Sequence, residues 1–170
     1  SIVEINDRPT VEEHQVDIVV ANYQEAATAA MHHLLAGGHR RIGLVYGVAR
    51  LDLGLDRWEP YRECLAGAGL PFDDSLVAHC GPRSEDGYTA ALQLLALAAR
   101  PTAIVAINDM LAIGVLRAAS DCGLHVPNDL SVIGFDDTEL SRYLVPRLTT
   151  ASRDAVRMGR EAAQLALARL

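Results

Sequence analysis

The chain has 170 residues, half of them hydrophobic and only 5% aromatic, and its formal net charge is −7 at pH 7. This composition excludes a disordered chain, because a sizeable core of Val, Ile, Leu and Ala can be buried, and the length suits one domain or two small lobes. The net negative charge argues against binding to the phosphates of a nucleic acid, because such binding requires a positively charged surface.

The sequence indicates neither a transmembrane segment nor disulfide bonds. No apolar run is long enough to cross a bilayer. Cys64, Cys80 and Cys122 are scattered without metal-ligand spacing, so they are interpreted as small apolar residues of a protein in a reducing, cytoplasmic compartment. Residues 1–6 resemble a strand already under way, with no turn or cap before it, so we expect the chain to be part of a longer protein.

Strands and helices alternate along the chain from residue 22 onward. The predicted helices cover residues 22–36, 57–68, 85–99, 109–123 and 153–170. The predicted strands cover residues 2–5, 41–46, 76–79, 103–107 and 130–135, and a strand-like piece covers 147–150. Asn22 and Asp109 are predicted to cap their helices, while Gly37, Gly69 and Pro101 follow helix ends.

This alternation predicts an α/β fold with right-handed crossovers and a parallel sheet covered by helices on both faces. In such sheets, ligands bind beyond the carboxyl ends of the strands. The side chains that follow the predicted strands there are Arg57, Arg83, Asn108, Asp109, Asp136 and Asp137. They offer both donors and acceptors, which favours a polyhydroxy ligand because each hydroxyl donates and accepts.

Several of these residues also have purely structural interpretations. Asp109 can be a helix cap, Arg83 a solvated loop residue and Asp137 a turn residue. Asp136 has the stronger claim to a ligand contact, because it directly follows the most apolar strand. Arg57 at a helix start opposes the helix dipole, which is unfavourable unless a nearby group requires a cation.

Motifs of enzymes and metal sites are missing from the sequence. There is no Gly-x-Gly-x-x-Gly after a strand, no Gly-Lys-Ser/Thr phosphate loop and no Gly-x-Ser-x-Gly elbow. His32 and His33 are adjacent on a predicted helix and face different directions, so they form no metal pair. Asp136 and Asp137 are disfavoured as a glycosidase pair, because neighbouring residues rarely converge on one bond. We expect no catalytic residue, no metal and no cofactor.

Several segments together resemble a known family. They are Gly38-His-Arg-Arg-Ile-Gly-Leu, Ala106-Ile-Asn-Asp-Met-Leu-Ala-Ile-Gly, Val126-Pro-Asn-Asp-Leu-Ser-Val-Ile-Gly-Phe-Asp-Asp, Pro146-Arg-Leu-Thr-Thr and Met158-Gly. In this order they closely resemble the lactose-repressor/galactose-repressor (LacI/GalR) transcription regulators over essentially the whole chain. The resemblance implies a periplasmic-binding-protein-like fold of two α/β lobes joined by three crossings.

The same resemblance implies a division of the chain. Residues 1–21 would be a remnant of the first lobe that ends in the first hinge crossing. Residues 22–146 would form the second, Rossmann-like lobe, and residues 147–170 would recross the hinge to a first-lobe helix. The other strands and helices of the first lobe are missing, so we expect a well-ordered second lobe and poorly covered remnants of the first.

Roles for single residues follow from the resemblance as well. Arg57, Asn108 and Asp136 match positions that contact the effector. Asn6 falls where a first-lobe aspartate is common. Pro82 stands about where many members carry an aromatic residue that stacks on the ligand, so a stacking platform is not expected there.

The resemblance also implies a homodimer. It places the segments that contain Ile113, Tyr143 and Leu144 at the dimer contact. Two further departures concern the hinge and the arginine motif. Ala21 replaces an aspartate that usually precedes Asn22, and Pro60 replaces the glycine that usually follows the arginine.

We therefore expect the effector-sensing and dimerising region of a cytoplasmic transcriptional repressor that binds a small metabolite, a sugar or related polar compound. Ligand binding would shift the population of lobe arrangements and thereby change operator affinity, through a helix-turn-helix region outside this chain. The chain itself is expected to contact neither DNA nor membrane. The alternative is a periplasmic sugar-binding protein of a transporter, and an α/β enzyme is a third interpretation.

Overall fold

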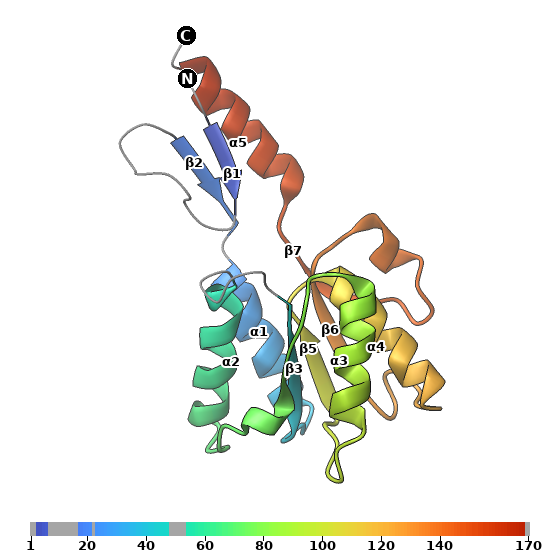
Figure 1. Cartoon of the computed structure of the whole chain (residues 1–170). Coiled ribbons are helices and arrows are strands. Elements are labelled where there is room, and N and C mark those ends of the chain that lie inside the picture. The colour runs from blue at the N-terminus through green and yellow to red at the C-terminus, as the bar shows by residue number, and fades with distance from the viewer. Residues whose placement is uncertain (1–2, 7–16, 22, 48–53, 169–170) are drawn as a thin grey trace.

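The computed structural model describes residues 3–6, 17–21, 23–47 and 54–168 (Figure 1). The chain forms two parallel sheets of unequal size. The smaller pairs β1 (Val3–Asn6) with β2 (Asp17–Val20). The larger has the strand order β4-β3-β5-β6-β7. Its strands are β3 (Ile42–Tyr46), β4 (Val77–His79), β5 (Ala103–Ala106), β6 (Ser131–Asp136) and β7 (Thr149–Ser152). The predicted α/β class with a parallel sheet is confirmed.

Helices cover both faces of the larger sheet (Figure 1). One face carries α1 (Tyr23–Ala36) and α2 (Leu55–Gly67), and the other carries α3 (Ser84–Leu95) and α4 (Asp109–Asp121). The last helix, α5 (Ala155–Ala168), packs on β1 and β2 instead. Short 3-10 helices at Asp74–Leu76 and Glu139–Arg142 precede β4 and follow β6.

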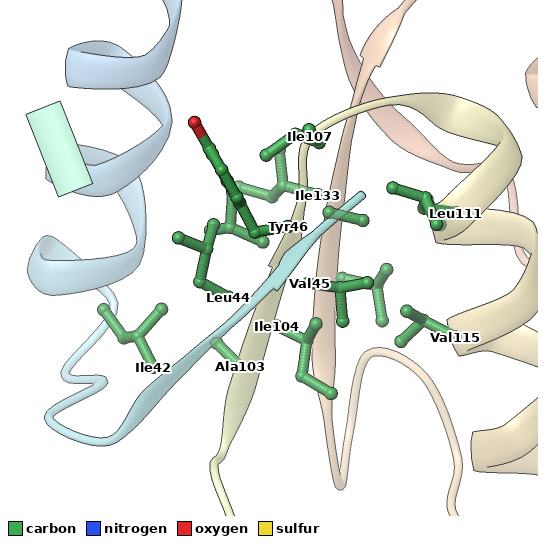
Figure 2. Packing of buried hydrophobic residues seen from close by; sticks show 14 of the residues in the cluster. Ile42, Leu44, Val45, Tyr46, Ala103, Ile104, Ile107, Leu111, Val115 and Ile133 are labelled. Atoms are coloured by element: carbon green, nitrogen blue, oxygen red, sulfur yellow. The ribbon is translucent and has the colours of Figure 1, made fainter. Parts of the chain in front are cut away.

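The core lies along β3 and β5, where every residue is buried. Successive side chains of a strand point to opposite faces. Leu44 and Tyr46 accordingly lie on the side of α1, while Val45 lies on the side of α4 with Leu111 and Val115 (Figure 2). A strand covered on both faces requires a continuous apolar run, which explains why these strands show no polar alternation.

Some predicted boundaries and one cap differ from the structure. The helix predicted over 85–99 ends at Leu95, and the strand predicted over 147–150 is 149–152. Asp109 is the first helical residue of α4 rather than its cap. The cap is Asn108, whose side-chain oxygen accepts the Leu111 N–H at 2.8 Å. Asn and Asp cap helices about equally well, so local sequence does not distinguish them. The predicted cap at Asn22 lies outside the described residues.

Two glycines allow α3 and α4 to pack backbone against backbone. A Cβ atom added to Gly87 would lie 2.5 Å from the carbonyl oxygen of Leu111. One added to Gly114 would overlap the carbonyl oxygen of Ser84. This close approach holds α4 against α3, and so fixes the first turn of α4 at the carboxyl edge of the sheet.

Replacing Gly114 with Ala should therefore destabilise the fold. The atoms that the new Cβ would meet belong to the backbone of Ser84 and Tyr88 and cannot rotate away, and overpacking of this kind costs about 1–3 kcal/mol of unfolding free energy. Gly159→Ala on α5 is the matched control, because nothing lies within 4 Å of its added Cβ and Ala is the better helix former. Urea unfolding measures both variants. Native-like stability for Gly114→Ala would contradict the close contact.

Candidate functional site

The carboxyl edge of the large sheet contains a reversal of strand order. β3 has β4 on one side and β5 on the other. In open parallel sheets, ligands bind beyond the strand ends beside such a reversal. β5 leads into Asn108, and β6 ends at Asp136. The edge thus carries two of the predicted ligand contacts.

Arg57 reaches this edge from the first turn of α2. It is buried, with 6% of its surface exposed. Its guanidinium carbon lies 4.3 Å from the centroid of the Tyr23 ring and 5.9 Å from that of Phe135. Its Nη1 also lies 3.5 Å from Oδ2 of Asp56. A guanidinium held against ring faces is weakly hydrated and fixed in orientation, which suits it to directional hydrogen bonding of a ligand.

Tyr23 joins Arg57 to Asp136. The Tyr23 hydroxyl donates to Oδ1 of Asp136 at 2.6 Å, and the guanidinium of Arg57 lies over the same ring. Tyr23 also meets Phe135 edge to face, with ring centroids 5.8 Å apart and an interplanar angle of 83°. The structure therefore brings the predicted residues Arg57 and Asp136 into one cluster, which we call the Tyr23 cluster (Tyr23, Arg57, Phe135 and Asp136).

Sequence reasoning missed Tyr23. The available signal was its position in the first turn of α1. A helix that precedes a parallel strand begins at the carboxyl edge of the sheet, where ligands bind.

The carboxylate of Asp136 lies in an unfavourable environment. Burial raises its pKa, and the nearby charge of Asp109 adds to the rise. The hydrogen bond from Tyr23 and the charges of Arg153 and Arg57 act in the opposite direction. The backbone of Asp136 has a φ of 115°, in a region that favours glycine. Strain and burial at one residue are typical of a site shaped for function rather than for stability.

Asn108 and Asp109 have separate roles at the start of α4. The side-chain oxygen of Asn108 caps the helix, so its amide nitrogen, with two donors, is the group left for a ligand. Asp109 is fully buried. Its Oδ2 accepts the backbone N–H and the hydroxyl of Thr138, at 2.8 and 2.9 Å, and its Oδ1 accepts the Thr150 hydroxyl at 2.5 Å. Asp109 therefore ties α4 to β7 and to the segment after β6.

The remaining predicted site residues belong to other parts of the fold or have other partners. Pro82 and Arg83 are exposed in the turn between β4 and α3. Asp137 forms an ion pair with Arg142, with 3.0 Å between Oδ2 and Nη2, as a turn residue would. Asn6 ends β1 in the smaller sheet, and its side chain lies outside the described residues.

Aromatic side chains that were not predicted gather where β3 and β4 end. The Trp58 ring lies 5.3 Å from the Tyr46 ring and 6.1 Å from the His79 ring, centroid to centroid. With Leu55 these three residues line a pocket of about 200 Å³. Trp58 is the neighbour of Arg57 on α2 and has the flat ring that Pro82 lacks.

Clustered metal-ligand side chains and long apolar helices are both absent from the part of the chain that the structure describes. Within those residues, no group of three or more His, Cys, Asp or Glu side chains is arranged to hold a metal ion. None of the helices described there is long and apolar enough to cross a membrane.

Comparison with known proteins identifies the family. The family model of the periplasmic binding protein-like domain matches residues 31–170. The HTH-type transcriptional repressor PurR of Haemophilus influenzae (strain PittEE) is 33% identical over 154 residues, which cover 91% of this chain and 46% of the repressor. The HTH-type transcriptional regulator GalR of Escherichia coli (strain K12) is 39% identical over 142 residues, covering 84% and 41%. The chain belongs to the periplasmic-binding-protein-like domain family, in the form found in LacI/GalR regulators.

Solved structures agree with this membership. A regulatory protein of the LacI family from Chloroflexus aggregans has a TM-score of 0.87 and 31% identity, covering 96% of this chain and 59% of that one. A LacI family transcriptional regulator from Enterococcus faecium with bound ribose has a TM-score of 0.88 and 29% identity, covering 98% and 61%. The LacI/GalR-type chain described here spans less than half of the two curated relatives, both of which are transcription regulators rather than enzymes.

The raised pKa of Asp136 predicts a specific dependence of stability on pH. The folded chain binds this proton more tightly than the unfolded chain. The contribution to stability is therefore full below the ordinary pKa of 3.8 and is lost as the pH rises through the folded pKa. Asp136→Asn keeps an acceptor for the Tyr23 hydroxyl and removes the buried charge. Its urea midpoint should exceed that of the native chain at pH 7, by a margin that shrinks as the pH approaches 3.8.

The control for this prediction is Asp137→Asn, which removes a neighbouring carboxylate that is paired with Arg142. It should not raise the midpoint. An Asp136→Asn variant that is less stable than the native chain at pH 7 would show that the buried charge is fully compensated in the fold.

Proposed function

We propose that this chain is the effector-binding and dimer-forming region of a cytoplasmic transcriptional repressor that senses a sugar or a related polyhydroxy metabolite. The observation that carries the proposal is the Tyr23 cluster, in which a buried arginine and a half-buried carboxylate are joined at the carboxyl edge of the sheet. Membership of the LacI/GalR family supports it. The family also favours a repressor over the alternative, a transporter's periplasmic sugar-binding protein.

The chemistry of the cluster suits a hydroxylated ring. Arg57 and the amide of Asn108 supply hydrogen-bond donors, and Asp136 supplies an acceptor. Adjacent hydroxyls of the ligand can therefore both accept and donate hydrogen bonds. Trp58 adds a flat apolar surface near Arg57, against which the carbon-bearing face of a sugar ring can pack. The ribose bound to the Enterococcus faecium regulator supports a monosaccharide as the size class.

The coupling to DNA is part of the same proposal. Residues 22–146 form the second lobe, and β7, which pairs with β6, extends its sheet before the chain recrosses the hinge. Residues 1–21 and α5 belong to the first lobe, whose remainder lies outside this chain. The small unit of β1, β2 and α5 stands apart from the larger sheet (Figure 1). Val156 and Leu167 on α5 are 75% and 67% exposed, which leaves an apolar surface that the rest of the first lobe would cover. An effector that bridges the lobes shifts their arrangement. This shift changes the affinity of a helix-turn-helix segment outside this chain for its operator.

A homodimer contact is proposed at the start of α4 and in the segment after β6. Large apolar side chains are exposed there at Met110 (46%), Leu140 (50%), Tyr143 (74%) and Val145 (99%). Exposed apolar groups gathered on neighbouring segments commonly mark an interface. Leu144 and Ile113 are half-buried, and Leu144 packs against the core. Tyr143 and Val145 are therefore the better positions at which to test the contact.

The effector site is tested in the complete protein. A thermal-shift screen of sugars that includes ribose identifies the ligand, because binding raises the melting temperature. Calorimetry then compares Arg57→Ala and Asp136→Asn with the native protein. Each hydrogen bond to a charged group contributes about 1.5–3 kcal/mol, so either variant should bind roughly tenfold to a hundredfold more weakly.

Arg62→Ala is the matched control, because Arg62 is an exposed arginine on the same helix. Asp136→Asn separates lost binding from lost folding, since we expect it to be the more stable protein at pH 7. Native affinity in both Arg57→Ala and Asp136→Asn would remove these residues from the effector site.

The dimer proposal is tested by placing charge in the contact. Tyr143→Asp and Val145→Asp, made together in the complete protein, should shift sedimentation towards monomer while the circular-dichroism spectrum stays native, because both side chains are exposed in the single chain. Ala66→Asp adds a charge to the exposed surface of α2 and should leave the dimer unchanged. Sedimentation as an undiminished dimer would place the contact elsewhere.

A further inference from the structure

A larger cavity lies at the opposite end of the sheet from the Tyr23 cluster. Its volume is about 550 Å³, within the range of small-molecule pockets. The end of α1 and the loop after it form one wall, and the segments entering β6 and β7 form the other. Because it is built at the amino ends of the strands, it shares no lining residue with the proposed effector site.

The floor of this cavity is apolar. Leu34, Val132, Ile133 and Leu148 line it and are buried. Pro127 and Pro146 line its exposed margin. An apolar floor beneath an open mouth favours a ligand with a hydrocarbon or aryl group that leaves water on binding.

The ionisable side chains of the lining are all of the basic type. The lining contains His33, His39 and Arg147 and no carboxylate, although the chain has 22 acidic residues against 15 Lys and Arg. Among the residues that the structure describes, the Arg147 guanidinium has no ion-pair or hydrogen-bond partner. The ring of His39 is oriented by Thr102, with 2.8 Å between Nδ1 and Oγ1. The cavity therefore combines an apolar floor with the guanidinium of Arg147, whose N–H donors have no anionic acceptor among the lining residues.

We propose that this cavity binds a small apolar carboxylate, with the carboxylate at Arg147 and the hydrocarbon or aryl group on the floor formed by Leu34, Val132, Ile133 and Leu148. The planar guanidinium matches a carboxylate in a two-bond geometry. Such a ligand would contact both α1 and the segment that leads into β7. These are the elements next to the two connections between the larger sheet and the small unit of β1, β2 and α5. The proposal does not depend on the identity of the effector at the opposite edge.

Benzoate is the probe for this site, and benzamide is its neutral counterpart of the same shape. Calorimetry on the complete protein should show saturable benzoate binding and at least tenfold weaker benzamide binding. Arg147→Gln should weaken benzoate binding by about tenfold, as expected for the loss of a charge-assisted pair. Arg147 is exposed, so the variant should fold as the native protein does. Arg160→Gln removes an exposed arginine on α5 that does not line the cavity, and it should bind benzoate normally.

Several results would overturn the proposal. The carboxylate role fails if benzamide binds as tightly as benzoate, or if Arg147→Gln binds benzoate normally. Competition by sulfate at equal concentration would show a site for inorganic anions without an apolar requirement. Loss of benzoate binding in Asp136→Asn would place the probe in the effector site instead. An absence of benzoate binding up to its solubility limit would exclude this class of ligand.

Discussion

The buried carboxylate of Asp109 holds the carboxyl edge of the large sheet together. A fully buried carboxylate is costly unless its oxygens are hydrogen-bonded, and here two threonines supply three donors to it. These bonds join α4, the segment after β6 and β7 at one point. Gly134 makes room for the group, because a Cβ there would lie 2.5 Å from Oδ1 of Asp109. The positions of Asn108 and Asp136 depend on this junction.

Next to this junction, the charged side chains of Arg57 and Asp136 are wholly or partly buried, which costs them hydration. Arg57 is buried against rings, and Asp136 combines a raised pKa with a backbone φ of 115°. Neither arrangement is expected in a sheet optimised for stability alone. A ligand that hydrogen-bonds Arg57 and Asp136 would compensate for the water that both have lost. This compensation gives the bound state an energetic advantage, which a two-lobe protein can use to shift its conformational population.

The two ends of the sheet differ in chemistry because they differ in construction. At the carboxyl edge, helix starts meet strand ends and bring an aromatic, a cation and a carboxylate together. At the amino end, the last turn of α1 and the segment entering β7 diverge around an apolar floor with a basic margin. The first arrangement suits a hydroxylated ring and the second an apolar anion. The connections to β2 and α5 run from the carboxyl edge (Figure 1). They adjoin α1 and β7, and the far end of α1 and the segment entering β7 line the cavity at the amino end.

Local patterns were enough to predict the α/β alternation, the buried strands and the place of Asp136 at the carboxyl end of a strand, although Asp136 is the last residue of β6 rather than the residue after it. Apolar runs and turn residues act over a few neighbouring residues, which is why such patterns suffice. Pairings over long distances in the chain required the folded structure. Tyr23 and Asp136 are 113 residues apart along the chain and meet only because α1 and β6 begin and end at the same edge. The roles of Trp58 and of Asp109, and the cavity around Arg147, likewise follow from packing between distant elements. Hydrophobic pattern determines which elements form and which faces they bury, whereas tertiary packing alone decides which side chains of those elements meet.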